Sequence, residues 1–81
     1  MAKRNHKVLG FVRCLPCIVC GRGPISDPDH IKTRGAGGKD ELENLQPLCR
    51  THHVERHAIG IKSFFEKYPC AITNRKDWGL K

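Results

Sequence analysis

Apolar residues recur at helical spacing in three parts of the chain, and glycine or proline follows each part. The stretch Val8–Val12 predicts a short N-terminal helix. A second helix is predicted from Thr51 to Ile59, and a third over "IKSFFEKY", residues 61–68. The residues that end these helices are Pro16, Gly60 and Pro69. This pattern favours short helices packed around a small core.

The segments between and after these helices have the patterns of a strand, a loop and a tail. "DPDHIKT" is typical of a short strand, broken at its start by Pro28, and "RGAGGK" of a glycine-rich loop. "ELENLQPL" carries leucines at helix-like spacing, but Pro47 limits it to one turn with a tail that packs on the core. "CAITNRKDWGLK" shows no clear period.

Length and charge narrow the class of protein. A chain of 81 residues buries only a modest apolar core, so a metal or disulfides are expected to stabilise it. The 15 Lys and Arg against 8 Asp and Glu give a net charge of +7, which favours nucleic acid as a partner. A basic surface that only confers solubility explains the charge equally well. We expect a basic arm over 1–10, one domain over 11–68 and a tail over 69–81.

The cysteines argue against a secreted protein. There are five, Cys14, Cys17, Cys20, Cys49 and Cys70, and an odd number is unusual for a disulfide framework. The apolar run Val8–Val12 is too short for an export signal or a membrane span. We therefore expect a reduced, cytoplasmic protein that binds zinc. A secreted disulfide-stapled binding protein is the alternative, and free thiols in the unfolded, unreduced chain would exclude it.

Two ligand pairs predict a structural zinc site. Cys17-x2-Cys20 and Cys49-x2-His52 together supply three sulfurs and one imidazole, a set that suits tetrahedral zinc. Cys14 could replace Cys17, because it also lies three residues from the next cysteine. The remaining cysteine, in the C-terminal tail, is predicted to be a buried or free thiol.

Further histidines indicate a second metal site. His53 and His57 lie on one face of the predicted helix, whereas His52 points about 100° away from His53, so one helix can serve two sites. Asp29 offers a carboxylate next to His30. Neighbours in a strand point to opposite faces, so both reach one site only where the strand is distorted. Without that distortion, Asp29 is a turn cap.

The order of these motifs resembles that of the HNH endonuclease family. "PCIVCG" supplies C-x2-C, then come "DH", an asparagine in "ENL", and LC-x2-HH-x3-H in "PLCRTHHVERH". The likeness covers about residues 14–68 and extends to small phage-type members and phage recombination-enhancement nucleases. It implies a small α+β fold with a treble-clef-like ββα-metal core, in which a β-hairpin and a helix hold one catalytic ion. A zinc knuckle, a short N-terminal helix and a C-terminal helix are added to that core.

The resemblance also implies a role for each motif residue. Asp29 and His53 match ligands of the catalytic ion, and His30 matches the general base. Asn44 matches the asparagine that fixes the loop holding that base. His57 matches the further ligand of members with a His-x3-His pair, such as colicin-type DNases. Many relatives lack this ligand, and an exposed helix residue is then the alternative for His57.

These roles predict a metal-dependent DNA endonuclease that nicks one strand, with weak sequence preference. A neutral imidazole can accept a proton from water, and one ion can neutralise the phosphate. One carboxylate and two imidazoles suit Mn²⁺, Ni²⁺ or Zn²⁺, and bind Mg²⁺ less tightly. The resemblance implies 5′-phosphate and 3′-hydroxyl products in a bacterial or phage-infected cell. A monomer, a homodimer and a phage or host protein partner all stay open.

Cations near the motifs are candidate phosphate contacts. They are Lys32, Arg34, Lys39, Arg50 and Arg56. Arg34 and Arg56 are favoured, because the guanidinium fork matches phosphate geometry, although solvated surface charge explains any single one equally well. The alternative function is a noncatalytic zinc-stapled module that binds nucleic acid. That alternative gives no reason for the Asp, His and Asn residues to occur at nuclease spacing.

Overall fold

The computed structural model describes residues 4–23 and 25–79. In chain order the elements are α1 (His6–Arg13), β1 (Asp27–His30), the 3₁₀ turns η1 (Arg34–Ala36) and η2 (Leu42–Asn44), β2 (Leu45–Leu48), α2 (Arg50–Ile59), α3 (Ile61–Lys67) and α4 (Cys70–Asp77). Over the described residues this is a small α+β fold with a two-stranded sheet and four α-helices, as predicted at that level. None of these helices combines the length and the apolar character that crossing a membrane requires.

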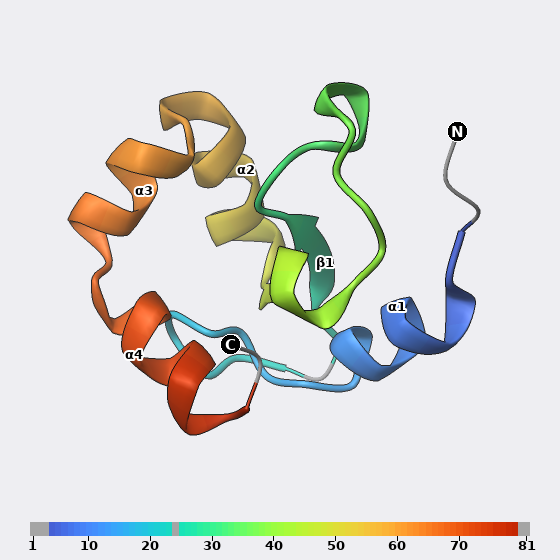
Figure 1. The fold of residues 1–81 in the computed structure, drawn as a ribbon. Helices are drawn as coiled ribbons and strands as arrows, with labels where there is room; N and C mark the ends of the chain where they lie inside the picture. The colour runs from blue at the N-terminus through green and yellow to red at the C-terminus, as the bar shows by residue number, and fades with distance from the viewer. Residues whose placement is uncertain (1–3, 24, 80–81) are drawn as a thin grey trace.

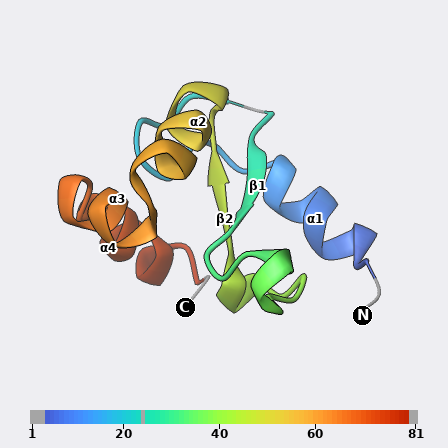
Figure 2. The same ribbon diagram turned by 90° about the horizontal axis from the view of Figure 1, so that it is seen from above.

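The two strands form a regular antiparallel pair whose faces have different chemistry. Asp29 lies opposite Gln46, and His30 lies opposite Leu45. Because side chains alternate along a strand, Asp27, Asp29, Gln46 and Leu48 share one face, and Pro28, His30, Leu45 and Pro47 share the other. The register contains no bulge, so the distortion expected around Asp29 and His30 is absent from β1. Figures 1 and 2 show the strands between α1 on one side and α2, α3 and α4 on the other.

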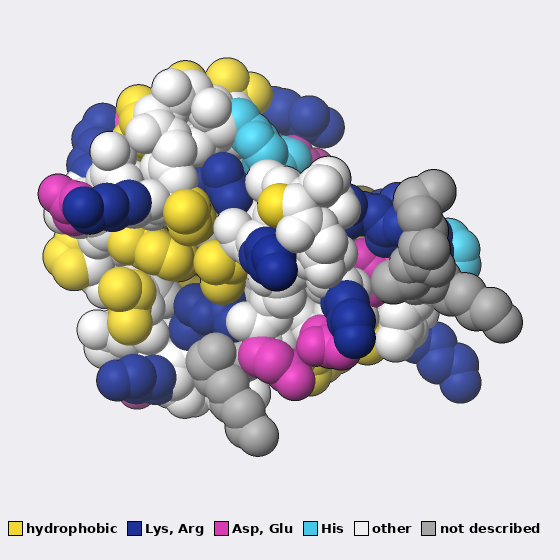
Figure 3. Space-filling view, turned by 45° about the horizontal axis from the view of Figure 1, so that its top comes forward, with side chains coloured by type: hydrophobic (Ala, Val, Ile, Leu, Met, Phe, Trp, Pro, Cys, Tyr) yellow, Lys and Arg dark blue, Asp and Glu magenta, His cyan; other side chains and the backbone are white. Residues whose placement is uncertain are grey.

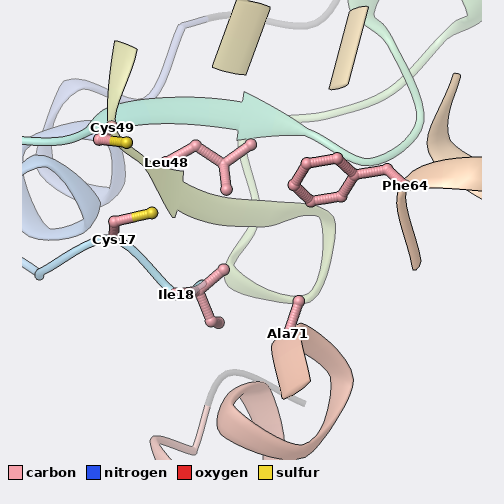
Figure 4. Close-up of a cluster of buried hydrophobic side chains, with 6 residues drawn as sticks. All are labelled: Cys17, Ile18, Leu48, Cys49, Phe64 and Ala71. Atoms are coloured by element: carbon pink, nitrogen blue, oxygen red, sulfur yellow. The ribbon is translucent and has the colours of Figure 1, made fainter. Parts of the chain in front are cut away.

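Each face of the sheet contributes one leucine to a different apolar cluster. Leu45 packs with Leu9 and Val12 of α1. On the other face, Leu48 packs with buried side chains from the cysteine turn (residues 17–20), the N-cap of α2, α3 and α4, namely Cys17, Ile18, Cys49, Phe64 and Ala71 (Figure 4). The small core is thus divided in two by the sheet.

The N-terminal helix is confirmed and is longer than predicted. Asn5 caps α1, since its side-chain oxygen accepts a hydrogen bond from Val8 N at 3.2 Å. Because α1 begins at His6, much of the predicted basic arm over 1–10 is a capped helix. Met1–Lys3 of that arm lie outside the described residues.

The prediction of one turn with a tail over residues 41–48 missed a strand. η2 is followed by β2, in which Leu45 and Leu48 are both buried although they lie on opposite faces. Pro47 fits this strand because it lies opposite Pro28, so the two residues without an N–H face each other. The Pro47 carbonyl accepts a hydrogen bond from Ile18 N at 2.9 Å.

The second and third predicted helices are confirmed, but the predicted tail over 69–81 contains a packed helix. Gly60, at φ 86°, separates α2 from α3 in a conformation that glycine adopts readily. In α4 the buried positions are Ala71 and Arg75. Arg75 donates to the carbonyls of Leu42, Glu43 and Leu45. A buried arginine gives no apolar period, which explains why the sequence pattern did not reveal α4.

Candidate functional site

The first cluster of candidate metal ligands joins the cysteine turn to the start of α2. Its four ligand atoms, from Cys17, Cys20, Cys49 and His52, lie within 4.8 Å of one another. The Sγ atoms of Cys20 and Cys49 are 3.8 Å apart, and Cys17 Sγ is 3.7 Å from His52 Nδ1. A tetrahedral zinc ion with Zn–S bonds of about 2.3 Å separates two sulfurs by about 3.8 Å. The cluster is therefore compatible with zinc, as predicted.

The two thiols of the cysteine turn have opposite pKa shifts. Burial raises the pKa of Cys17, but hydrogen bonds from the backbone amides of Cys49, Cys20 and Val19 outweigh it, so the pKa is lowered. Burial and the neighbouring sulfurs of Cys17 and Cys49 raise the pKa of Cys20. Crowded thiolates repel one another, and a bound cation would remove that repulsion.

The other two cysteines lie outside this cluster. Cys14, the alternative ligand to Cys17, is exposed and follows α1 directly. Cys70 is an exposed free thiol at the start of α4, in agreement with the second of its two predicted states.

A second cluster brings together Asp29 of β1 with His53 and His57 of α2. Asp29 Oδ1 is 3.5 Å from Nε2 of each histidine, and the two Nε2 atoms are 3.1 Å apart. Asp29 Oδ1 is buried and has no hydrogen-bond partner. A buried carboxylate oxygen without a donor is costly. A divalent ion would supply the missing partner, and one carboxylate with two imidazoles is a donor set that such ions accept.

Neighbouring side chains fix the direction of these ligands. Gln46 and Arg56 donate to Asp29 Oδ2 at 2.9 and 3.0 Å, which leaves Oδ1 towards the histidines. Asp27 lies on the same face of β1, and its Oδ2 is 3.0 Å from His53 Nδ1. With Nδ1 held by Asp27, His53 Nε2 points towards Asp29. A carboxylate behind a histidine is a common second layer of metal sites.

His30 borders a pocket beside the second cluster, and its side chain lies on the face of β1 opposite to that of Asp29. The pocket has a volume of about 230 Å³ and is lined by Pro28, His30, Thr33, Arg34, His53 and His57. Pro28 and His30 line it from one face of β1, and His53 and His57 line it from α2, which contacts Asp29 on the other face, so the pocket lies across the edge of β1 that does not pair with β2. His30 is thus held beside the second cluster without a bulge, because the pocket wraps around this edge.

Asn44 fixes the loop between the strands. Its Oδ1 accepts a hydrogen bond from Lys32 N at 2.8 Å, and its Nδ2 donates to the carbonyls of Lys32 and Lys39, each at 3.0 Å. Gly38 lies inside this arrangement, where an added Cβ would be 1.7 Å from the Lys32 carbonyl oxygen. The position of the loop therefore depends on the hydrogen bonds of Asn44 and on the absence of a side chain at Gly38.

Comparison with known proteins assigns the family. A family model described as "Putative HNHc nuclease" matches residues 4–76, nearly all of the chain. The chain belongs to the HNH nuclease family. It is also 37% identical over 67 residues to "Uncharacterized protein YdfU" of Escherichia coli (strain K12). That match covers 79% of this chain, but the chain spans only 19% of the length of that relative. No solved structure matches the chain.

The cations of this HNH family member lie in different environments. Lys32, Lys39 and Arg50 are exposed, and Arg34 lines the pocket. Figure 3 shows a group of histidine side chains near the top of the view with Lys and Arg side chains near them, and a further histidine apart at the right. Arg56 differs, because its side chain is only 6% exposed and donates to Asp29 and to the carbonyls of His30 and Ile31. The structure therefore does not place Arg56 on the surface, where a phosphate contact was predicted.

Sequence reasoning missed three residues that support the site. Asp27 could have been found, since it lies two residues before Asp29 in a predicted strand. Gln46 lies in the strand that was not predicted, and it reaches Asp29 across the sheet. Asp40 lies after the glycine-rich loop, where no period indicates which way its side chain points.

Proposed function

We propose that this chain is a metal-dependent DNA endonuclease that nicks one strand by phosphodiester hydrolysis. One observation carries the proposal: the buried Asp29 Oδ1, without a hydrogen-bond partner, converges with His53 Nε2 and His57 Nε2 beside His30. The proposed core is of the ββα-metal type, made of β1, β2 and α2. A binding module would gain nothing from placing an imidazole next to such a set.

In the proposed reaction Asp29, His53 and His57 hold one divalent ion. That ion would neutralise the phosphoryl oxygens and assist the departing 3′ oxygen. His30 accepts a proton from the attacking water, while Asn44 keeps the loop that follows β1 in place. Mn²⁺, Ni²⁺ and Zn²⁺ suit this donor set, and Mg²⁺ suits it less well. One such site cuts one strand, so a duplex break takes two nicks or a pair of chains.

DNA is proposed to bind mainly through its phosphates. The candidate contacts are now Arg34 in the pocket wall and the exposed Lys32, Lys39 and Arg50, whereas Arg56 is assigned to the interior. Contacts of this kind carry little sequence information, which supports weak sequence preference. The net charge of +7 favours the same substrate class.

The first cluster is proposed to hold structural zinc. Cys17, Cys20, Cys49 and His52 join the cysteine turn to α2, so zinc would fix the helix that carries the second cluster. Thiolate ligands call for a reducing compartment such as the cytoplasm. Because α1 and α4 both supply core residues, we extend the proposed nuclease unit beyond 11–68 to include them.

Nicking of supercoiled plasmid tests this function. The purified chain is incubated with Mn²⁺, Mg²⁺, Ni²⁺ or chelator, beside His30→Ala and the control His6→Ala, which changes an exposed histidine of α1. We expect nicking with metal in the wild type and the control, and a loss of about 100-fold or more in His30→Ala. The absence of nicking by every protein, with all ions and on single-stranded DNA, would refute the proposed nuclease function. Equal nicking by all three proteins would refute His30 as the general base.

Metal stoichiometry separates the nuclease from a noncatalytic zinc module. Both predict one tight zinc at the first cluster. Only the nuclease predicts a second, weaker ion that His57→Ala removes, measured by calorimetric titration with Mn²⁺ after zinc loading. A single site that His57→Ala leaves unchanged would favour the binding module.

A further inference from the structure

A buried carboxylate from the loop between the strands binds His30. The side chain of Asp40 is 1% exposed, and its Oδ1 is 2.7 Å from His30 Nε2 and 3.1 Å from Arg34 Nη1. Its Oδ2 accepts hydrogen bonds from Arg4 Nε at 3.1 Å and from Asn5 N at 2.9 Å. Asp40 is therefore surrounded by donors from three separate segments of the chain.

We propose that Asp40 is a positioning residue that fixes the tautomer and the direction of the His30 ring, so that Nδ1 is the nitrogen that accepts the proton from water. This inference rests on the proposed nuclease function. It adds a residue that the HNH motifs do not contain and assigns the reacting nitrogen of the base.

The tautomer follows from what each group can donate. An ionised carboxylate only accepts hydrogen bonds, so the nitrogen that faces it must carry the proton. A neutral imidazole has one N–H, which the 2.7 Å contact places on Nε2. Nδ1 then has the free lone pair that a general base needs.

The surroundings of Asp40 keep it ionised. Burial alone would raise the pKa of its carboxyl. Hydrogen bonds from His30 and Asn5 and the charges of Arg4 and Arg34 outweigh burial and hold that pKa well below its usual range. The carboxylate is thus available as an acceptor throughout the range in which nucleases act.

The same loop contacts explain how Asp40 itself is held. Asn44 Nδ2 donates to the carbonyl of Lys39, the residue before Asp40. Asn5 N, which donates to Asp40, belongs to the cap of α1. Asn44 therefore holds the backbone next to Asp40, and Asp40 in turn holds the ring of His30. The same carboxylate also accepts a hydrogen bond from the N-cap residue of α1.

The test compares Asp40→Ala and Asp40→Asn with Glu41→Gln, which changes an exposed carboxylate beside it. Long-range ¹H–¹⁵N NMR of the zinc-loaded full chain reports the tautomer of His30, whose signals are assigned with His30→Ala. Steady-state plasmid nicking, with DNA in excess over the enzyme, reports kcat and KM. In the wild type and Glu41→Gln we expect His30 to carry its proton on Nε2.

Asp40→Ala is expected to give a mixture of His30 tautomers and a kcat lower by about 100-fold, with KM within about twofold, because the base is displaced and not the substrate. Asp40→Asn is expected to recover part of the preference for the Nε2–H tautomer and part of the lost kcat, since its amide oxygen can still accept a hydrogen bond from Nε2. It also serves as the folded variant if Asp40→Ala does not fold. A wild-type ring protonated on Nδ1 would overturn the inference, as would tautomer and kcat values in both Asp40 variants equal to those of Glu41→Gln. If the wild type does not nick DNA, the proposed nuclease function is refuted. The NMR measurement of the His30 tautomer then tests, without any activity, whether Asp40 positions the ring.

Discussion

Replacing Arg56 with methionine is expected to destabilise the fold, not to weaken DNA binding selectively. The guanidinium donates to Asp29 Oδ2 and to the carbonyls of His30 and Ile31, each at 3.0 Å. Methionine fills a similar volume but supplies none of these donors. The fully buried Asp29 would then lose its arginine partner, and two carbonyls would lose a donor.

The size of the effect follows from the burial of this pair. Removing one partner of a buried ion pair costs about 3–5 kcal/mol, because the other charge stays buried and uncompensated. A chain of 81 residues has a net stability of about 4–12 kcal/mol, so the loss is a large part of the total. With a urea m-value of about 1–1.5 kcal/mol/M, the unfolding midpoint should fall by about 2 M or more.

Arg50→Ala is the matched control on the same helix. Its side chain is 79% exposed and lies 3.3 Å from Asp27, an ion pair of the kind worth about 0–1 kcal/mol. We expect its urea midpoint to stay near that of the wild type, while the salt dependence of DNA binding loses about one phosphate contact. Both variants are compared at one zinc per chain. If Arg56→Met kept the wild-type midpoint and lost DNA affinity, Arg56 would be the phosphate contact that the sequence predicted.

Three further perturbations test the loop, the buried carboxylate and the zinc cluster. Gly38→Ala places a Cβ 1.7 Å from the Lys32 carbonyl oxygen, so it should lower the free energy of unfolding by about 1–3 kcal/mol and remove much of the nicking activity. Gly35→Ala is the control, because nothing lies within 4 Å of its added Cβ, and it should change stability little. Equal shifts of the two variants in thermal melts would contradict this prediction. The depressed pKa of Asp40 means that its stabilisation is present above the unfolded pKa of about 3.9 and is lost as pH falls below that value. The stability advantage of the wild type over Asp40→Asn in urea should therefore shrink below about pH 4, and a constant difference would refute the assignment. Chelation of zinc should lower the far-UV helical signal and weaken Mn²⁺ binding at the second cluster, and unchanged Mn²⁺ affinity would show that the two clusters are independent.

Ligand spacing along regular elements made much of the candidate site predictable. His57 lies four positions after His53, which on a helix places both on one face, and their Nε2 atoms are 3.1 Å apart. A spacing of three residues likewise keeps Cys17 close to Cys20 and Cys49 close to His52, as the two zinc-ligand pairs require. Local geometry thus accounts for the closeness of ligands within each pair, whereas the meeting of the pairs depends on the tertiary structure.

Features that depend on tertiary contacts were not predictable in this way. Leu45 and Leu48 belong to a strand buried on both faces, so their spacing of three resembled a helix. Arg56 lies three residues after His53 and turns inward, but a charged residue on a helix is ordinarily assigned to solvent. Asp40 meets His30 only because the intervening loop folds back, and this loop has no repeating pattern.

Polar contacts and metal ligands, more than apolar packing, hold the helix that carries both clusters. Of the ten residues in α2, Arg56 is the one that the structure buries, and no apolar side chain of this helix is buried. Its attachments are instead Cys49 and His52 at the first cluster, His53 to Asp27, and Arg56 to Asp29. A helix without a buried apolar face depends on such specific contacts for its position. Since His52 and His53 are adjacent, whatever holds the imidazole of His52 also sets where His53 and His57 can meet Asp29. We therefore expect the first cluster to determine the ligand geometry at the second, and a zinc ion there to affect the proposed nicking activity through the position of α2.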